Sequence, residues 1–383
     1  MKTSIVFFMS CFLFLGISLS AQNTAKNVVD QGYFPIAVWL QEPSLAQQYK
    51  DNGINMFVGL FRGLTQESLD IFRATGMKFV CSPDGFARQH KDEPLIYAWM
   101  HGDEPDNAQW NRQKQTYDPC VDPGKIIADY EKMKAFDPTR PVYLNLGRGV
   151  AVTNWGGRGE CTGKTDMYKV SNDGYLKGCD IASFDVYPVN STEKEVKNSL
   201  WYVAEGINNL EKWSNYAKPA WCWIETTLID KNAERKPTPA EVKSQVWMAI
   251  IHGAGGIGYF CHSFHPNTVA NALLRDEEMI AGVKAINQQV TQLARVINTP
   301  NTSGFAMVSS SNPAVPIDIM TKNDDGVNYL FSVAMRPGKS TAEFRVSAGE
   351  EVEVLGENRT IQIKNGIFTD TFSDYDVHLY KVK

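Results

Sequence analysis

Short apolar runs recur along the first three quarters of the chain, and turn-forming residues bound each of them. The runs have the length of buried strands and are rich in β-branched and aromatic residues. They are 34–40, 55–61, 78–82, 96–102, 141–146, 180–187, 219–225 and 256–263. The pattern therefore predicts eight strands in this part of the chain.

Helical patterns separate most of the predicted strands. A capping box with proline at the first helical position begins a helix at Thr238, and Gly76 ends a short one over 66–75. Apolar residues at steps of three and four indicate a long helix over 196–213, and further helices are expected at 44–52, 124–136 and 280–296. Eight strands alternating with helices predict a (β/α)8 TIM barrel. A doubly wound open sheet is the alternative, but it rarely needs eight strands in so regular an alternation.

The sequence pattern changes after Pro300, where asparagine, aspartate, glycine and proline separate short strand-like runs. These runs are 304–310, 317–320, 328–334, 342–346, 351–354, 361–364 and 377–382. They predict a small all-β sandwich of about 80 residues. We therefore expect a barrel over 22–300 and a C-terminal β-sandwich over 301–383.

The N-terminus has the features of a secretory signal peptide. Lys2 precedes an apolar run over 5–19, and Ser20-Ala21 offers small residues for cleavage. The run is shorter than the roughly 20 residues that span a membrane. We expect residues 1–21 to be removed, and the mature chain to be secreted, periplasmic or at the cell surface, without an integral membrane segment.

Composition narrows the choice of partner. With 38 Lys+Arg against 43 Asp+Glu, the formal net charge is −5, which argues against nucleic acid or an anionic membrane as the main partner. The chain is 43% apolar and 21% charged, as in ordinary globular proteins. Its 9 Trp, 15 Tyr and 19 Phe suit a large core and stacking on sugar rings.

Cysteine and glycine motifs give no sign of a cofactor or metal. No CxxC or HExxH occurs, and Gly253–Gly258 matches GxGxxG only between a helix and a strand, the wrong order for a dinucleotide site. Of the seven cysteines, Cys120 and Cys161 lie in polar, Gly/Pro-rich stretches. They are the disulfide candidates, and their bridge would close a loop of about 40 residues.

Candidate catalytic residues follow the predicted strands, because TIM-barrel active sites lie at the C-terminal ends of the strands. Glu104 and Glu225 each follow a Trp-rich strand, the fourth and the seventh, which face each other across the barrel mouth. Two carboxylates about 5–5.5 Å apart form the catalytic pair of a retaining glycosidase. Glu104 and Glu225 are therefore candidates for such a pair, although a lone glutamate after a strand is usually a surface or capping residue.

The segments WMHGDEP (99–105) and WCWIE (221–225) resemble the strand-4 acid/base and strand-7 nucleophile motifs of clan A glycoside hydrolases. Arg62 is similar to the arginine beside the nucleophile in that clan, and Tyr187 to the tyrosine that hydrogen-bonds it. The resemblance implies a retaining β-glycosidase that acts on a β-linked oligo- or polysaccharide, with Glu104 as acid/base and Glu225 as nucleophile. One departure is Asp103, because the clan usually has asparagine there, which binds the sugar 2-hydroxyl.

Further residues are candidates for binding substrate or supporting the site. They are Arg62, Asp103, Asn145, Asp185, Tyr187, Trp39, Trp110, Trp155, Trp223 and His262. For Asp103 and Asp185 a structural hydrogen-bonding role is an equal alternative, and Trp223 is as well explained by the core. The competing function is a non-catalytic glycan-binding protein on a decayed glycosidase barrel, which the Asp103 departure keeps open.

Overall fold

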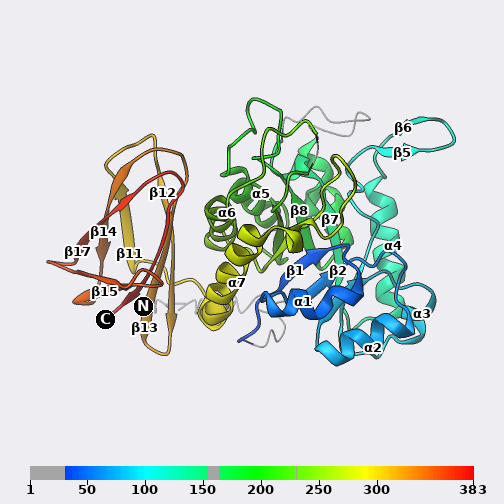
Figure 1. The fold of residues 1–383 in the computed structure, drawn as a ribbon, viewed down its shortest axis with the longest axis horizontal. Helices are drawn as coiled ribbons and strands as arrows, with labels where there is room; N and C mark the ends of the chain where they lie inside the picture. The colour runs from blue at the N-terminus through cyan, green and yellow to red at the C-terminus, as the bar shows by residue number, and fades with distance from the viewer. Residues whose placement is uncertain (1–30, 154–163, 230) are drawn as a thin grey trace, which may run out of the picture.

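The computed structural model describes residues 31–153, 164–229 and 231–383. A closed barrel of parallel strands surrounded by helices is followed by two antiparallel sheets (Figure 1). This confirms the predicted TIM barrel followed by a β-sandwich. The predicted signal peptide lies outside the described residues, and the predicted division at residues 300 and 301 stays a prediction.

The barrel strands coincide with the eight apolar runs. Around the ring the order is β1, β10, β9, β8, β7, β4, β3 and β2. Their bounds are β1 Ile36–Trp39, β2 Met56–Val58, β3 Lys78–Cys81, β4 Ile96–Met100, β7 Val142–Leu146, β8 Ile181–Asp185, β9 Ala220–Glu225 and β10 Gly256–Phe260. Parallel pairing brings the C-terminal ends of all eight strands to one end of the barrel, which we call the mouth.

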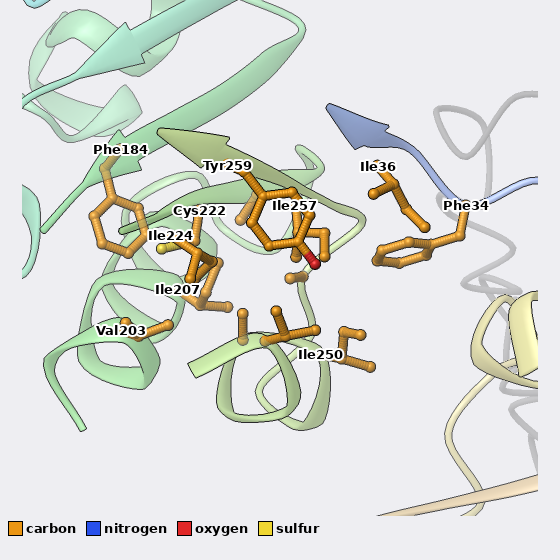
Figure 2. Close-up of a cluster of buried hydrophobic side chains, with 14 of the residues drawn as sticks. Phe34, Ile36, Phe184, Val203, Ile207, Cys222, Ile224, Ile250, Ile257 and Tyr259 are labelled. Carbon is orange, nitrogen blue, oxygen red and sulfur yellow. The ribbon is translucent and has the colours of Figure 1, made fainter. Parts of the chain in front are cut away.

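Successive side chains of each strand point to opposite faces, so the barrel has two cores. In β9, Trp221 and Trp223 belong to the inner core, whereas Cys222 and Ile224 pack against the surrounding helices. Figure 2 shows Cys222 and Ile224 beside Val203 and Ile207 of the neighbouring helix. Because both faces of the strands are buried, the strands appear in the sequence as unbroken apolar runs.

The helices lie around the barrel and have the predicted caps. The Thr238 hydroxyl accepts from the Glu241 backbone N–H, and Gly76 ends its helix with φ 66°. The bounds are α1 Ala46–Asp51, α2 Gln66–Thr75, α3 Gly85–Gln89, α4 Pro123–Phe136, α5 Tyr202–Trp213, α6 Pro239–Ile251 and α7 Glu277–Ile297. Short 3-10 helices lie at Pro43–Leu45, Arg148–Val150, Thr165–Met167, Val170–Asn172, Tyr175–Gly178 and Ala272–Arg275.

The long helix predicted over 196–213 is only partly correct, because α5 begins at Tyr202. Asn198 adopts φ 58°, a left-handed conformation that interrupts a right-handed α-helix. Its N–H donates to the Pro188 carbonyl. Val196 and Leu200 are nevertheless buried. The apolar spacing therefore reported burial correctly and the backbone conformation wrongly.

The C-terminal sandwich pairs a sheet β11-β14-β17 with a sheet β12-β13-β18-β15-β16. Its strands are β11 Ala306–Ser310, β12 Ile317–Asp324, β13 Val327–Ala334, β14 Ser340–Val346, β15 Glu351–Val354, β16 Arg359–Gln362, β17 Ile367–Phe372 and β18 Val377–Val382. Strand β17, in which Phe368 and Phe372 alternate with polar residues, was not predicted from the sequence. Phe368 stacks on Phe344 at 4.7 Å between ring centroids, so β17 supplies part of the sandwich core.

The sandwich packs on the outer helices of the barrel. Phe331 of β13 lies against Trp247 of α6, with ring centroids 5.3 Å apart, and the Ser244 hydroxyl donates to the Tyr375 carbonyl at 2.7 Å. Figure 1 shows α6 and α7 on the side of the barrel that faces the sandwich. The sandwich therefore lies beside the barrel rather than over its mouth. Among the helices described, none is long and apolar enough to cross a membrane.

Candidate active site

Glu104 lies at the mouth, just beyond the end of β4, in a strained backbone conformation. Its φ is 42°, which non-glycine residues rarely adopt, and its N–H donates to the Asn145 carbonyl at 3.1 Å. Such strain costs about 1–3 kcal/mol and concentrates at functional sites. The backbone of Glu104 is thus held in place by the neighbouring strand β7.

Asp185, the last residue of β8, meets Glu104 at the mouth. The two carboxyl groups lie within hydrogen-bonding reach, and the Tyr187 hydroxyl lies near Asp185. Burial, together with the adjacent Glu104, raises the pKa of Asp185 well above its usual range. Within the part of the chain described, Oδ1 of Asp185 is buried and has no hydrogen-bond partner. The mouth therefore holds two adjoining carboxyl groups, one from each of two different strand ends.

Asp103 lies beside this pair and is exposed to solvent at the mouth. Asn145 donates to it at 2.9 Å, and Asn145 in turn accepts from the Ser183 hydroxyl at 2.6 Å. Although the residue as a whole is exposed, neighbouring protein atoms desolvate its carboxylate, and together with the charge of Glu104 they raise the pKa of Asp103 to about 7. Asn145 is therefore a support for Asp103, and the structure brings Asp103, Glu104 and Asp185 together, as the strand ends suggested.

Two supporting residues next to Glu104 were not predicted. Asn107 donates from Nδ2 to Glu104 at 3.0 Å, whereas Asp106 is buried and accepts from the Gly147 N–H at 2.8 Å and the Tyr168 hydroxyl at 2.9 Å. Burial, and next the charge of Glu104, raise the pKa of Asp106 to about 7. Their position directly after Glu104-Pro105 was the available signal, because a short polar segment after a strand folds back on the strand end.

Glu225 ends β9, but its carboxylate has no exposure to solvent. It accepts from the Val189 N–H at 2.8 Å and from the N–H and Nδ2 of Asn190 at 2.9 and 2.7 Å. Burial raises the pKa of Glu225 to about 7, although these three donors oppose the shift. The group thus joins β9 to the loop after β8. The nucleophile role predicted for Glu225 stays a prediction, and this placement speaks against it.

The arginine expected beside Glu225 is also elsewhere. Arg62 is exposed in the loop after β2 and lines a recess of about 190 Å³ with Gln41, Glu42 and Phe61. The hydrogen bonds of Glu225 come from the loop after β8 instead. The structure therefore does not bring Arg62 and Glu225 together.

The predicted aromatic residues divide into buried and exposed groups. Trp39 and Trp223 belong to the inner barrel core, where their rings meet at 4.9 Å, so they are core residues beneath the site. Trp110 is exposed on a hairpin, as predicted for a sugar platform. Trp155 lies outside the described residues.

His262 is a buried part of an aromatic cluster at the mouth. Its ring lies 5.1 Å from Phe260 and 5.9 Å from Phe264, and Tyr187 lies 5.1 Å from Phe260. Burial lowers the pKa of His262, so the ring is neutral at neutral pH. A neutral aromatic cluster is better suited to contact the apolar face of a sugar ring than to bind an ion.

Most cysteines in the described residues are buried. Cys161 lies outside the described residues, so its predicted bridge to Cys120 stays a prediction. Cys81, Cys222 and Cys261 are buried free thiols. In residues 31–153, 164–229 and 231–383, no group of three or more His, Cys, Asp or Glu side chains is arranged to hold a metal ion.

Comparison with known proteins relates the chain to solved structures by shape alone. A GH42 β-galactosidase from G. stearothermophilus, solved as a catalytic mutant, is similar with a TM-score of 0.56 and 8% identity over 92% of this chain and 98% of that one. An α-amylase from Geobacillus thermoleovorans is similar with a TM-score of 0.54 and 9% identity, with the same coverage. Neither models of protein families nor curated proteins match the sequence.

At this level of identity the likeness shows the fold and nothing finer. The chain has the barrel and the β-sheet region of these glycoside hydrolases, and it covers nearly their whole length. One neighbour is a β-galactosidase and the other an α-amylase, so the fold leaves the sugar and the anomeric linkage open.

Proposed function

We propose that this chain is a secreted glycoside hydrolase that cleaves a β-linked carbohydrate with retention of configuration. The observation that carries the proposal is the Glu104–Asp185 pair at the mouth of the barrel. Glycoside cleavage needs one protonated and one ionised carboxyl group. Two adjoining carboxyl groups can pass a proton directly from one to the other, so the pair can supply both states.

In this mechanism Glu104 is the acid/base. It gives its proton to the glycosidic oxygen as the bond between that oxygen and the anomeric carbon breaks, and it later removes a proton from the attacking water. Its carboxylate is steadied by Asn107, and its backbone by Asn145. Rigid support of this kind keeps a proton donor aligned with the leaving oxygen.

For the second carboxylate we propose Asp185 in place of Glu225. Asp185 lies against Glu104 and has a buried oxygen without a hydrogen-bond partner in the described chain, whereas the oxygens of Glu225 are taken by three donors. Asp185 would first pass its proton to the adjoining Glu104, which gives a proton to the leaving oxygen, and the Asp185 carboxylate would then attack the anomeric carbon and form the glycosyl-enzyme. Inverting enzymes keep their carboxyl groups about 6.5–9.5 Å apart to admit a water. Two adjoining groups leave no such room, which favours retention.

The remaining features of the proposal rest on the sequence. Secretion rests on the predicted signal peptide at 1–21, and β-linkage on the resemblance of the segments around Glu104 and Glu225 to clan A motifs. A panel of aryl β- and α-glycosides, followed by NMR of the first-formed anomer, tests linkage and retention together. Hydrolysis of α-glycosides alone, or a product of inverted configuration, would contradict these finer parts.

The roles of the carboxyl groups are tested by variants on two kinds of substrate. Glu104→Ala should slow hydrolysis of natural glycans by about 10²–10⁴-fold, because a poor leaving group needs the acid. It should spare the first step on an activated aryl glycoside, and added azide should restore turnover by attacking the glycosyl-enzyme. Equal losses on both substrates would remove Glu104 from this role.

Asp185→Asn and Glu225→Gln separate the two candidates for the nucleophile. We expect Asp185→Asn to abolish turnover of both substrate types, since no glycosyl-enzyme can form. Glu225→Gln should lower the melting temperature while the remaining folded enzyme keeps its turnover. The reverse result, with a stable but inactive Glu225→Gln and an active Asp185→Asn, would restore the assignment made from the sequence.

The second candidate is a non-catalytic glycan-binding protein on a decayed barrel. The burial of Glu225, together with aspartate in place of asparagine at 103, is the observation that favours it. Any hydrolysis by the wild-type chain excludes this candidate. An inactive wild type with an active Asp103→Asn variant would instead identify a recently lost activity.

A further inference from the structure

Exposed aromatic side chains concentrate at the mouth of the barrel. Four of the six large apolar side chains exposed in the described residues follow the C-terminal ends of barrel strands, and all four are aromatic. The six are Phe61, Trp110, Tyr117, Tyr216, Phe264 and Met307, of which Tyr216 and Met307 lie away from the mouth. Exposed apolar groups gathered at one face mark a binding surface.

On one side of the mouth, ring contacts connect the exposed Phe61 and Phe264 with the carboxyl pair. Phe264 follows β10 and stacks parallel to His262, which Phe61 meets edge-on at 6.1 Å. The contacts continue through Phe260 to Tyr187, whose hydroxyl lies near Asp185. A chain of aromatic ring contacts therefore connects the exposed Phe61 and Phe264 with the carboxyl pair.

On the other side the aromatic residues stand on a hairpin, β5 Gln109–Asn111 and β6 Thr116–Asp118. The rings of Trp110 and Tyr117 meet at 5.0 Å and are 49% and 39% exposed. The hairpin projects from the barrel (Figure 1). Its first strand begins two residues after Asn107, which donates to Glu104, so its base is fixed to the acid.

The strand order places these two aromatic groups on opposite sides of the carboxyl pair. In the ring of eight, β10 and β4 are four positions apart and face each other. Phe264 follows β10, and the hairpin follows β4. A ligand that contacts both groups must therefore cross Glu104 and Asp185.

We propose that the mouth binds a glycan chain of several sugar units, which runs from Phe61 and Phe264 over the carboxyl pair to Trp110 and Tyr117, and is cut internally. The cutting rests on the proposed function, whereas the binding does not. A sugar ring buries its apolar face on an aromatic side chain. An enzyme that removes single terminal sugars needs such contacts on one side of the bond, and this mouth has them on both.

Binding is measured by affinity gel electrophoresis in barley β-glucan, xylan, galactan and galactomannan, with Glu104→Gln as the parent so that no glycan is consumed. We expect at least one glycan to retard the parent. Trp110→Ala and Phe264→Ala should each weaken that binding about tenfold, the loss expected when one aromatic contact is removed. Tyr216→Ala and Met307→Ala, which remove exposed side chains elsewhere, should bind as the parent does.

Three results would overturn the inference: no retardation by any of the four glycans, parental binding by both mouth variants, or a loss confined to one side. Internal cutting predicts that wild type lowers the viscosity of the bound glycan and releases a ladder of oligosaccharides. Release of a single monosaccharide would keep the proposed function and end the inference. Binding by both aromatic groups without any hydrolysis would end the proposed function and keep the binding surface.

Discussion

The carboxyl groups at the mouth are held by neutral donors. Asn145 donates to Asp103, Tyr168 to Asp106 and Asn190 to Glu225. Neutral donors offset only part of the cost of burying a charge, whereas an arginine or lysine would favour the charged form. The pKa of each of these three groups is accordingly raised to about 7. At the scale of single residues, these three carboxyl groups therefore gain or lose their protons near neutral pH.

The raised pKa of Asp106 should make the free energy of unfolding depend on pH. Its pKa rises from 3.8 to about 7 on folding, so between these values the folded chain holds a proton that the unfolded chain has lost. The contribution is fully present below pH 4 and is lost as pH rises through 7. We expect Asp106→Asn to reduce the fall in unfolding free energy between pH 4.5 and 7.5 by on the order of 2–4 kcal/mol.

The measurement is chemical unfolding at several pH values. The Tyr168 hydroxyl can turn to accept from an amide, so the variant should keep its fold. Asp92→Asn, which changes an exposed carboxylate, is the control and should leave the wild-type pH dependence unchanged. A stability curve of Asp106→Asn parallel to that of wild type would contradict the argument.

At the scale of elements, glycines in β10 allow this strand to pack beside the large side chains of β9. The inner faces of β9 carry Trp221 and Trp223, which fill the barrel interior. Gly258 lies beside Trp223 in the neighbouring strand, and a Cβ built on it would be 2.1 Å from a Trp223 ring atom. The glycine run that resembles a nucleotide motif therefore has a packing role, because it leaves space for two indole rings.

Gly258→Ala should destabilise the barrel. Contacts at this distance force the indole ring or the backbone to move, and overpacking of this kind costs about 1–3 kcal/mol. Gly102→Ala is the matched control, because a Cβ there meets no atom within 4 Å, and it should change stability by less than about 0.5 kcal/mol. Urea unfolding measures both, and equal stability of the two variants would contradict the packing account.

At the scale of the whole molecule, barrel and sandwich share a core. Phe331 and Leu379 of the sandwich belong to the same buried cluster as Trp247 and the other barrel helix residues. An ion pair between Arg295 of α7 and Asp324 adds a polar contact at the edge. A shared apolar core makes the two parts a single unfolding unit, unlike domains that are joined by a linker alone.

Phe331→Ala should therefore destabilise the entire chain and not only the sandwich. Phe331 is fully buried against Trp247, and truncating a buried phenylalanine costs about 3–5 kcal/mol. We expect one calorimetric transition in wild type and one, at lower temperature, in the variant. Met307→Ala, at an exposed site of the same sandwich, should leave the transition in place. A variant in which only part of the heat absorption shifts would indicate independent domains.

The periodicity of apolar residues by itself determined the eight strands, their alternation with helices and the change to an all-β region. Capping residues such as Thr238 and Gly76 also located helix ends, because caps act within one turn of the chain. Glu104 could also be found from local sequence, because it follows closely after a predicted strand and strand ends define the mouth of a barrel.

Tertiary structure alone decided which of these residues meet. Glu225 also follows a strand, yet Val189 and Asn190 from another loop take its oxygens. Asp185 instead adjoins Glu104, across 81 residues of sequence. The backbone of 196–201 likewise follows the Asn198 contact with Pro188 and departs from the helical spacing. Periodicity reports whether a side chain is buried, whereas its partner depends on how loops distant in sequence fold over the strand ends.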